Sequence, residues 1–331
     1  MIGIDVGGTK TLGLRVETIA GAATDATGRP ARPEVLDRER TGSAADSIVA
    51  LDRIETVVET LLARAEAAGA PAPEAIGIGL AGFVSRDGIV ISAPNTSGLV
   101  GVDVPGHLRT RFGLPVVVDN DANCVAIAAR AEIAPDVDTM VAVTLGTGIG
   151  GGIIVGGELL RGANGFAGEP GHMVIDPDGP ICPCGQRGCW ERYASGSGLA
   201  WLARVAAASG RADSLLAAAG SIDAIRGEHV TALLDEGDVA AMAVFTDFAG
   251  YVALGLANLI MLLDPELIVI GGGLAAQGER LSDLVRAALV ERFPAATRYR
   301  ELHLVVAPEG PEAGALGAAL SATGLAVHPP G

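Results

Sequence analysis

Cysteines, aromatic residues and clusters of positive charge are all scarce in this sequence. Four of its 331 residues are cysteine and 3% are aromatic, while 39 acidic residues outnumber 23 basic ones to give a formal charge of −16. Four cysteines do not make the disulfide framework of a small secreted domain, so we interpret them as thiols or metal ligands in a reducing compartment. The acidic balance argues against nucleic acid and anionic membranes as partners.

A long uninterrupted apolar run is also missing. The longest apolar stretch, roughly 251–263, contains Gly255 and Asn258 and stops at Asp264, so it is expected to be too short to cross a bilayer. The N-terminus has no basic segment followed by a long apolar one, which predicts no secretion signal. We therefore expect an acidic enzyme located in the cytoplasm.

The sequence does have the apolar content of a folded protein. Hydrophobic residues make up 49% of it, and 47 residues are glycine. This content excludes intrinsic disorder, and the length predicts roughly two globular domains.

Predicted strands alternate with predicted helices, which indicates an α/β fold. Apolar residues from Ile54 to Ala65 recur at steps of three and one, as on one face of a helix over about 47–69. Glycine turns join two pairs of predicted strands, so we expect two similar halves. The other predicted elements are strands at 2–6, 12–16, 75–80, 88–92, 115–119, 139–145, 153–155, 267–270 and 302–306, a helix at 120–130, a loop-rich insertion at 157–196 and an alanine-rich linker at 207–227.

The first glycine turn follows a carboxylate at the end of a predicted strand. Its backbone N–H groups can bind phosphate while Asp5 holds a divalent cation such as Mg²⁺. No helix opens after Lys10, so the Walker pattern is absent. Taken alone, a tight hairpin explains this turn equally well. The candidate residues are Asp5, Gly7, Gly8, Thr9 and Lys10.

Two further glycine-rich segments extend the phosphate hypothesis. The segment 144–152 has five glycines in nine residues, so its backbone can approach a bulky anion without Cβ clashes. The segment 268–273 fits a nucleotide base or ribose, although a strand-to-helix turn explains it as well. The candidate nucleotide residues here are Thr144, Gly146, Thr147, Gly148, Gly271, Gly272 and Gly273.

Asp121 follows a predicted strand in the segment Asn120-Asp-Ala-Asn123. A carboxylate at the carboxyl end of such a strand lies where open α/β sheets bind ligands, and it could accept a proton from a substrate hydroxyl. The alternative is an N-cap, because Asn and Asp before a helix satisfy its first N–H groups.

One histidine and three cysteines lie within eighteen residues of one another. His172, Cys182, Cys184 and Cys189 provide a complete tetrahedral zinc set with no open position, which is typical of a structural site. The spacing matches no common zinc-finger template. Cys124, on an alanine-rich helix, is better interpreted as an isolated buried thiol.

Together these segments resemble the ROK family, and within it the bacterial glucokinases, over nearly the whole chain. The matching motifs are DxGGTK at 5–10, NDAN at 120–123, LGTGIGGG at 145–152, GExGH at 168–172, CxCGxxGCxE at 182–191 and the late IVIGGG segment. The resemblance implies the two-domain actin-like, ribonuclease-H-like α/β fold of sugar kinases, with an inter-domain cleft and a zinc-binding loop. It also implies a homodimer, for which the apolar stretch 245–263 is a candidate surface.

The resemblance places family roles on individual residues. Asp121 matches the catalytic base, and His172, Cys182, Cys184 and Cys189 match the zinc ligands. The implied sugar contacts are Gly82, Asn95, Asn120, Asp121, Glu169, His172 and Glu191. The implied domains are 1–118 with about 309–331, closed by the C-terminal helix, and 119–308 with the zinc loop at 168–191. One departure is Asp119, where the family more usually has glutamate; Pro170 fills a variable position.

The resulting hypothesis is an ATP-dependent kinase that converts glucose to glucose 6-phosphate, with a structural Zn²⁺ and with Mg²⁺ bound to ATP. Alternatives within enzymes are another hexose or N-acetylhexosamine kinase and a polyphosphate-dependent glucokinase. A sugar-binding regulatory protein is the non-enzymatic alternative. The DNA-binding repressor branch of the family needs a helix-turn-helix before the first glycine turn, and Asp5 is expected to come too early for one.

Overall fold

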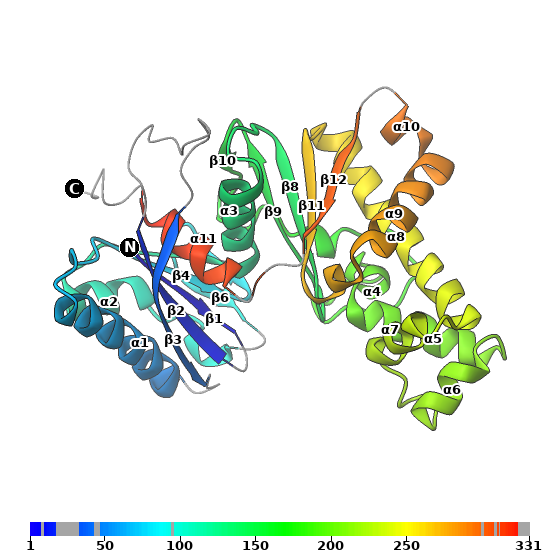
Figure 1. The fold of residues 1–331 in the computed structure, drawn as a ribbon, viewed down its shortest axis with the longest axis horizontal. Coiled ribbons are helices and arrows are strands. Elements are labelled where there is room, and N and C mark those ends of the chain that lie inside the picture. The colour runs from blue at the N-terminus through cyan, green and yellow to red at the C-terminus, as the bar shows by residue number, and fades with distance from the viewer. Residues whose placement is uncertain are drawn as a thin grey trace. The chain divides into compact units, whose positions relative to one another are not determined.

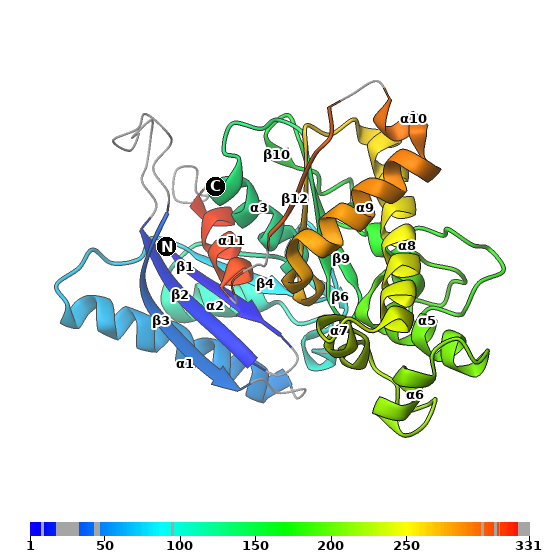
Figure 2. The same ribbon diagram turned by 45° about the vertical axis from the view of Figure 1, so that its right-hand side comes forward.

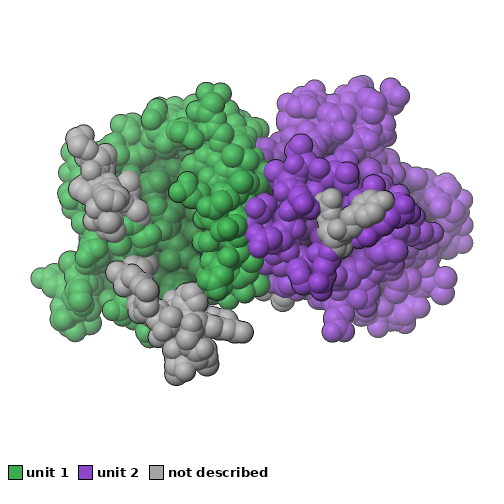
Figure 3. Space-filling view, turned by 90° about the horizontal axis from the view of Figure 1, so that it is seen from above, with its two compact units in different colours: residues 1–138, 152–168, 310–331 green, residues 139–151, 169–309 purple. Residues whose placement is uncertain are grey.

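A computed structural model of the chain describes residues 1–7, 10–17, 33–42, 47–93, 96–298, 301–307, 310 and 312–323. The chain forms two compact units, which Figure 3 shows in green and purple. Unit 1 consists of residues 1–138, 152–168 and 310–331, and unit 2 of residues 139–151 and 169–309.

Unit 1 is built on a five-stranded mixed sheet with the order β3-β2-β1-β4-β7 (Figure 1). Strand β1 pairs antiparallel with β2 and parallel with β4, and β4 pairs parallel with β7. The carboxyl ends of β1 and β7 therefore lie at the same edge of the sheet. The strands are β1 (Ile2–Val6), β2 (Lys10–Glu17), β3 (Glu34–Gly42), β4 (Ile76–Leu80) and β7 (Val116–Asn120).

Helices cover both faces of this sheet. Helix α1 (Ser47–Ala67) packs on β1, β2 and β3 and buries Ile54, Val57 and Leu61 in the core of unit 1, which confirms the predicted helix. On the other face, α11 (Ala313–Ser321) packs against α3 (Asp121–Ile133), and Figures 1 and 2 both show these two helices side by side. Helix α11 approaches β4 so closely that residue 77 must be glycine, because a Cβ at Gly77 would lie 1.7 Å from the oxygen of Ala318.

Smaller elements complete unit 1. Helix α2 (Val104–Phe112) begins at Asp103, whose side chain accepts a hydrogen bond from the Gly106 N–H, and it ends at Gly113 with a φ of 68°. The others are β5 (Phe83–Val84), β6 (Val90–Ser92), the 3₁₀ turn η1 (Ser97–Leu99) and β10 (Glu158–Leu159).

The second sheet has the order β10-β9-β8-β11-β12, which repeats the strand pattern of the first. Its other strands are β8 (Met140–Leu145), β9 (Ile149–Val155), β11 (Leu267–Gly271) and β12 (His303–Val306). Strand β11 runs parallel to β8 and β12. The two predicted similar halves are therefore confirmed as two mixed five-stranded sheets.

The core of unit 2 forms around α8 (Val239–Leu263). By length and composition α8 could cross a membrane, but 56% of its most apolar window is buried, and Phe245 and Phe248 are completely buried. Core packing accounts for its composition. Around it lie α4 (Glu191–Ala194), α5 (Gly196–Ala208), α6 (Asp213–Ala219), α7 (Gly227–Asp235), α9 (Gly278–Arg292), α10 (Pro294–Thr297) and the 3₁₀ turns η2 (Pro170–His172) and η3 (Gly273–Gln277).

The structure differs from the sequence-based expectations in several places. The predicted domain 119–308 is divided differently, because α3 packs on α11 and β4 and belongs to unit 1. The turn predicted at 146–152 is shorter, since β9 already begins at Ile149. The apolar stretch near Tyr251–Leu263 is the end of a 25-residue helix. The edge strand β3 and helices α2 and α6 were not predicted.

Candidate active site

Two acidic side chains of unit 1 lie close together at the carboxyl edge of its sheet. Burial and the neighbouring Asp121 raise the pKa of Asp5 to about 6, against a smaller opposite effect of Lys10. Burial also raises the pKa of Asp121. Two carboxylates that repel each other at a buried edge fit a site for a divalent cation or a shared proton.

Asp121 is the first residue of α3 and is not its N-cap. Asn120 fills that position, and its Oδ1 accepts hydrogen bonds from the N–H groups of Ala122 at 2.8 Å and Asn123 at 3.1 Å. The Asp121 carboxylate accepts from the adjacent Ala122 N–H, at 2.9 Å. The N-cap role therefore belongs to Asn120 and does not by itself account for Asp121.

Asn120 also joins α3 to the β4–β5 connection. Its Nδ2 donates to the carbonyl oxygen of Gly82 at 2.9 Å. Gly82 has a φ of 124°, and a Cβ there would lie 2.1 Å from the Ser92 oxygen, so glycine is required. The structure thus brings together Gly82, Asn120 and Asp121, three of the residues expected to contact sugar.

The first glycine turn is only partly described. Gly7 donates its N–H to the Lys10 oxygen at 3.0 Å, which closes the hairpin between β1 and β2. Gly8 and Thr9, predicted to bind phosphate, and Asn95, predicted to contact sugar, lie outside the described residues.

A half-buried ion pair beside the acidic edge was not predicted from the sequence. Asp119 accepts from Arg161 Nε at 2.9 Å and Nη2 at 2.8 Å through its Oδ2 atom. Its Oδ1 accepts from the Asn120 N–H and from Asn123 Nδ2, both at 2.8 Å. The Asp119 side chain is only 8% exposed. The one signal in the sequence was the departure of Asp119 from the family's usual glutamate.

The second and third glycine segments line one cavity in unit 2. Gly146, Thr147 and Gly273 contribute to its wall, and its volume is about 660 Å³. Gly272 has a φ of 82° and lies so close to β8 that a Cβ would be 2.7 Å from the Leu145 nitrogen, while Gly271 pairs with Thr144. The remaining lining residues are Leu145, Gly196, Ser197, Ala200, Arg204, Arg226, Gly227, Glu228, Thr231, Leu274, Ala276 and Gln277.

The N-terminus of α5 packs directly on the glycine turn. Gly196 donates its N–H to the Gly146 oxygen at 2.7 Å, which fixes the turn. The guanidinium groups of Arg204 and Arg226 both donate to the Ile225 oxygen. The cavity has apolar walls and a fixed glycine backbone, and its two arginines donate to backbone oxygens. Such a cavity suits a nucleobase and ribose better than a chain of phosphates alone.

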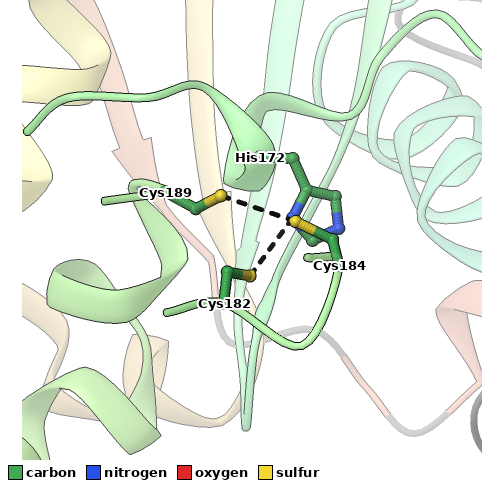
Figure 4. A group of neighbouring side chains, drawn as sticks. All are labelled: His172, Cys182, Cys184 and Cys189. Carbon is green, nitrogen blue, oxygen red and sulfur yellow. Dashed lines mark hydrogen bonds between the residues drawn. The ribbon is translucent and has the colours of Figure 1, made fainter. Parts of the chain in front are cut away.

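The four predicted zinc ligands form one cluster in unit 2 (Figure 4). Their ligand atoms all lie within 4.8 Å of one another. Cys184 Sγ is 3.6 Å from Cys189 Sγ, and Cys182 Sγ is 3.8 Å from His172 Nδ1. Tetrahedral zinc with Zn–S bonds of about 2.3 Å places its sulfur ligands roughly 3.8 Å apart, so these residues fit the ion.

The loop around the cluster is shaped for metal binding. Cys182 donates its N–H to the Gln186 oxygen at 2.7 Å, and Gly185 turns the chain with a φ of 93°. Burial and the neighbouring thiols raise the pKa of Cys189 to about 12. A divalent cation would remove the cost of bringing thiolates so close together. Cys124 lies apart in the core of unit 1, where burial raises its thiol pKa.

Glu191 links the zinc loop to the glycine turn. Its Oε2 accepts from the Ile149 N–H at 3.0 Å, and its Oε1 accepts from Cys182 Sγ at 3.6 Å. Glu169 precedes η2, and its carbonyl oxygen accepts from the His172 N–H at 3.2 Å. Glu169, His172 and Glu191, the sugar contacts expected in the second half, thus all belong to unit 2.

A two-unit α/β chain with this repeated sheet order and a His/Cys₃ cluster has the actin-like fold of the sugar kinases. The ROK family model matches residues 1–324. The chain belongs to this family and is a ROK family sugar kinase.

Several characterised proteins resemble it along their whole length. A glucokinase of Streptomyces coelicolor is 36% identical over 324 residues, covering 96% of both chains. An N-acetylmannosamine kinase of Escherichia coli is 32% identical over 327 residues, covering 98% of both. The crystal structure of a ROK glucokinase from Streptomyces griseus in complex with glucose and AMPPNP has 35% identity and a TM-score of 0.75, covering 97% of this chain and 98% of the other.

Proposed function

We propose that the protein is an ATP-dependent glucokinase that forms glucose 6-phosphate, with Asp121 as general base. The observation that carries the proposal is that Asn120, and not Asp121, is the N-cap of α3, while the Asp121 carboxylate is buried at the edge of the sheet. Its raised pKa brings proton affinity closer to the working pH, as general base catalysis requires. The glucokinase relatives support glucose as the sugar.

Phosphoryl transfer depends mainly on position and charge. Asp121 would accept the proton of the sugar hydroxyl while that oxygen attacks the γ-phosphorus and the bond to ADP breaks. Asp5, whose pKa of about 6 leaves it largely ionised at neutral pH, would hold Mg²⁺. Mg²⁺ neutralises phosphate charge when it is bound with ATP.

Sugar hydroxyls are proposed to bind side chains that accept or donate in fixed positions. In unit 1 these are Asn120 and Asp121, and Gly82 and Asn95 are proposed as further sugar contacts. In unit 2 they are Glu169, His172 and Glu191. His172 Nδ1 lies 3.8 Å from Cys182 Sγ, on the side of the proposed zinc ion.

The cavity of unit 2 supports ATP as the donor. Its walls combine Leu145, Ala200, Leu274 and Ala276 with the glycine turns. A polyphosphate chain would need cations along its length, whereas Arg204 and Arg226 are held by backbone oxygens. We propose that the base and ribose occupy this cavity and that Thr144, Gly146, Thr147, Gly148 and the glycines at 271–273 serve the nucleotide.

Zinc is proposed to act through structure. Cys182, Cys184, Cys189 and His172 would hold it, and the ion would keep the loop carrying Glu169 and Glu191 in one conformation. No chemical step requires it.

The decisive experiment is a coupled assay of the wild type and of Asp121→Asn. Asparagine keeps the size of the side chain, and the cap on Asn120 is untouched, so the variant should fold normally and retain its zinc. We expect kcat to fall by about 10²–10⁴ and the KM for glucose to change much less. An Asp121→Asn enzyme within a few-fold of wild type would show that Asp121 is not the base.

The same assay separates the alternative donors and sugars. Glucose, fructose, mannose and N-acetylmannosamine are each combined with ATP and with polyphosphate. We expect the highest kcat/KM for glucose with ATP. Preference for N-acetylmannosamine would instead follow the kinase of Escherichia coli described above, and inactivity with every pair would support a regulatory sugar-binding protein.

We also propose a cytoplasmic homodimer. Most of 245–263 is core, but Met261 and Leu262 at the end of α8 are 57% and 77% exposed and could meet a second copy. Light scattering at micromolar concentration should give about twice 33.2 kDa. A mass of one chain at all concentrations would contradict the dimer.

A further inference from the structure

The Asp119–Arg161 pair holds the residues on either side of the proposed base. Asp119 Oδ1 accepts hydrogen bonds from the N–H of Asn120 and from Asn123 Nδ2, both at 2.8 Å. Its carboxylate therefore holds the first turn of α3 in place. Asp121 lies between these two anchored residues. If the Asp119 carboxylate rotates, its hydrogen bonds to Asn120 and Asn123 are disturbed, and the backbone of Asp121 between them is expected to shift.

Arg161 fixes the orientation of that carboxylate. It reaches Asp119 with two N–H groups, at 2.9 and 2.8 Å, from 42 residues further along the chain. Both N–H groups donate to the same oxygen, Oδ2, while Oδ1 accepts from Asn120 and Asn123, so the arginine and the helix hold opposite oxygens of one carboxylate. Without Arg161, a carboxylate only 8% exposed would lose its cationic partner and would turn.

The segment that carries Arg161 is itself held in place. The Ala167 N–H donates to the Arg161 oxygen at 3.1 Å, and Arg86 Nε donates to the Gly162 oxygen at 2.7 Å. Phe166 packs edge-on against Phe83, with ring centroids 5.8 Å apart. Arg161 is therefore attached to a fixed loop of unit 1, unlike a mobile surface arginine.

We propose that Arg161 is a positioning residue for phosphoryl transfer, acting through Asp119 on the placement of Asp121. The proposal rests on the proposed function, since it needs Asp121 to be the base. A purely structural ion pair would lower stability and leave the catalytic constants of the folded enzyme unchanged. A positioning residue lowers kcat with little effect on KM, because the substrates still bind while the base is misplaced.

The pH dependence separates the two roles further. Asp5 from β1 interacts electrostatically with Asp121 and has Lys10 beside it, and Cys124 on the same helix as Asp121 is surrounded by Asp5, Asp119, Asp121 and Arg161. Arg161→Met leaves Asp119 as an extra negative charge near the base, which raises the pKa of Asp121. The acid limb of kcat against pH should then move to higher pH. The double variant with Asp119→Asn removes both charges and should move the limb back.

The test compares wild type, Arg161→Met, Arg161→Lys, Asp119→Asn and the double variant in the glucose and ATP assay. The control is Arg64→Met, which breaks the Arg64–Asp37 pair of unit 1 far from β7 in the sheet order. We expect Arg161→Met to lose about 10- to 100-fold in kcat with both KM values within about threefold. Arg161→Lys, which keeps the charge and should fold even where the methionine variant does not, should recover part of that loss. Arg64→Met should match wild type.

Three outcomes overturn the proposal. They are an Arg161→Met kcat within about threefold of wild type, an acid limb that does not move, and equal losses in Arg64→Met. An inactive wild type would contradict the proposed function and this role together, whereas an active wild type with an unaffected Arg161→Met would contradict only the role of Arg161. Melting temperatures and zinc content of every variant accompany the kinetics.

Discussion

The Glu191 carboxylate accepts a hydrogen bond from the backbone N–H of Ile149 at 3.0 Å, and this contact is possible only because residue 148 is glycine. A Cβ at Gly148 would lie 2.2 Å from Glu191 Oε2. Gly148 was predicted from the sequence to serve the nucleotide. The structure gives it a second requirement, which is room for a carboxylate that also contacts Cys182.

We predict that Gly148→Ala displaces Glu191 and raises the KM for glucose about 10- to 100-fold. The charge-assisted hydrogen bond from the Ile149 N–H, which orders Glu191 for its proposed contact with the sugar, would be lost. Gly146→Ala is the matched control for folding, zinc content and sugar binding, since its Cβ would meet nothing closer than the Gly148 oxygen at 4.0 Å. Steady-state kinetics and sugar titration provide the measurement. An unchanged glucose KM in Gly148→Ala would show that Glu191 does not contact the sugar.

Zinc is expected at about one ion per chain, as four ligands of this kind in one cluster require. Cys184→Ala should lose the ion and, with it, sugar binding. Cys124→Ala is the control, because that thiol lies in the other unit and should leave the zinc content unchanged. Elemental analysis with glucose titration tests both statements. Fully active protein without zinc would rule out the structural role.

Asp5→Asn is predicted to stabilise the protein above neutral pH while lowering kcat. The pKa of Asp5 is raised in the folded state, to about 6 from 3.8, so the folded form binds the proton more tightly than the unfolded form. The stability linked to this group is therefore fully present below pH 3.8 and is lost as pH rises through about 6. At pH 8, without Mg²⁺ or nucleotide, the variant should gain up to about 3 kcal/mol in unfolding free energy.

Urea unfolding at pH 8 and at pH 3.5 provides the measurement for Asp5→Asn. Most of the gain should be absent at the acidic pH, where the wild-type carboxyl is mostly protonated in both states. A variant that is no more stable than wild type at pH 8 would contradict the raised pKa. Wild-type activity should also decline below about pH 6 as Asp5 takes up a proton.

Gly255→Ala should destabilise unit 2 through the zinc loop. Trp190, which lies between Cys189 and Glu191 in the sequence, is completely buried, and a Cβ at Gly255 would lie 2.0 Å from its ring. Overpacking of this kind costs about 1–3 kcal/mol. The indole N–H also donates to the Tyr251 oxygen at 2.7 Å, which prevents a simple rotation. Thermal unfolding measures the loss, with Gly273→Ala, which meets no atom within 4 Å, as control. Equal stability of the two variants would be the contrary result.

The sequence was sufficient for features that depend on neighbouring residues. The step pattern of apolar residues predicted α1, which is confirmed at Ser47–Ala67. The spacing of one histidine and three cysteines predicted the cluster around His172, because a tight loop brings such close ligands together whatever the rest of the fold does. The glycine turns likewise predicted the repeated halves.

Other features depend on segments that are far apart in the chain, and only the tertiary structure decided them. No periodicity in the sequence predicts the contact between Asp119 and Arg161. No residue near Gly148 in the sequence predicts that Glu191 packs beside it. The cap of α3 is a local feature that the sequence left open between Asn120 and Asp121, and the structure assigns it to Asn120. The edge strand β3 escaped prediction because its exposed and half-buried residues alternate without an apolar run. Local patterns determine elements and ligand types, whereas packing between distant segments determines which side chains meet, because close approach is fixed by shape and not by order along the chain.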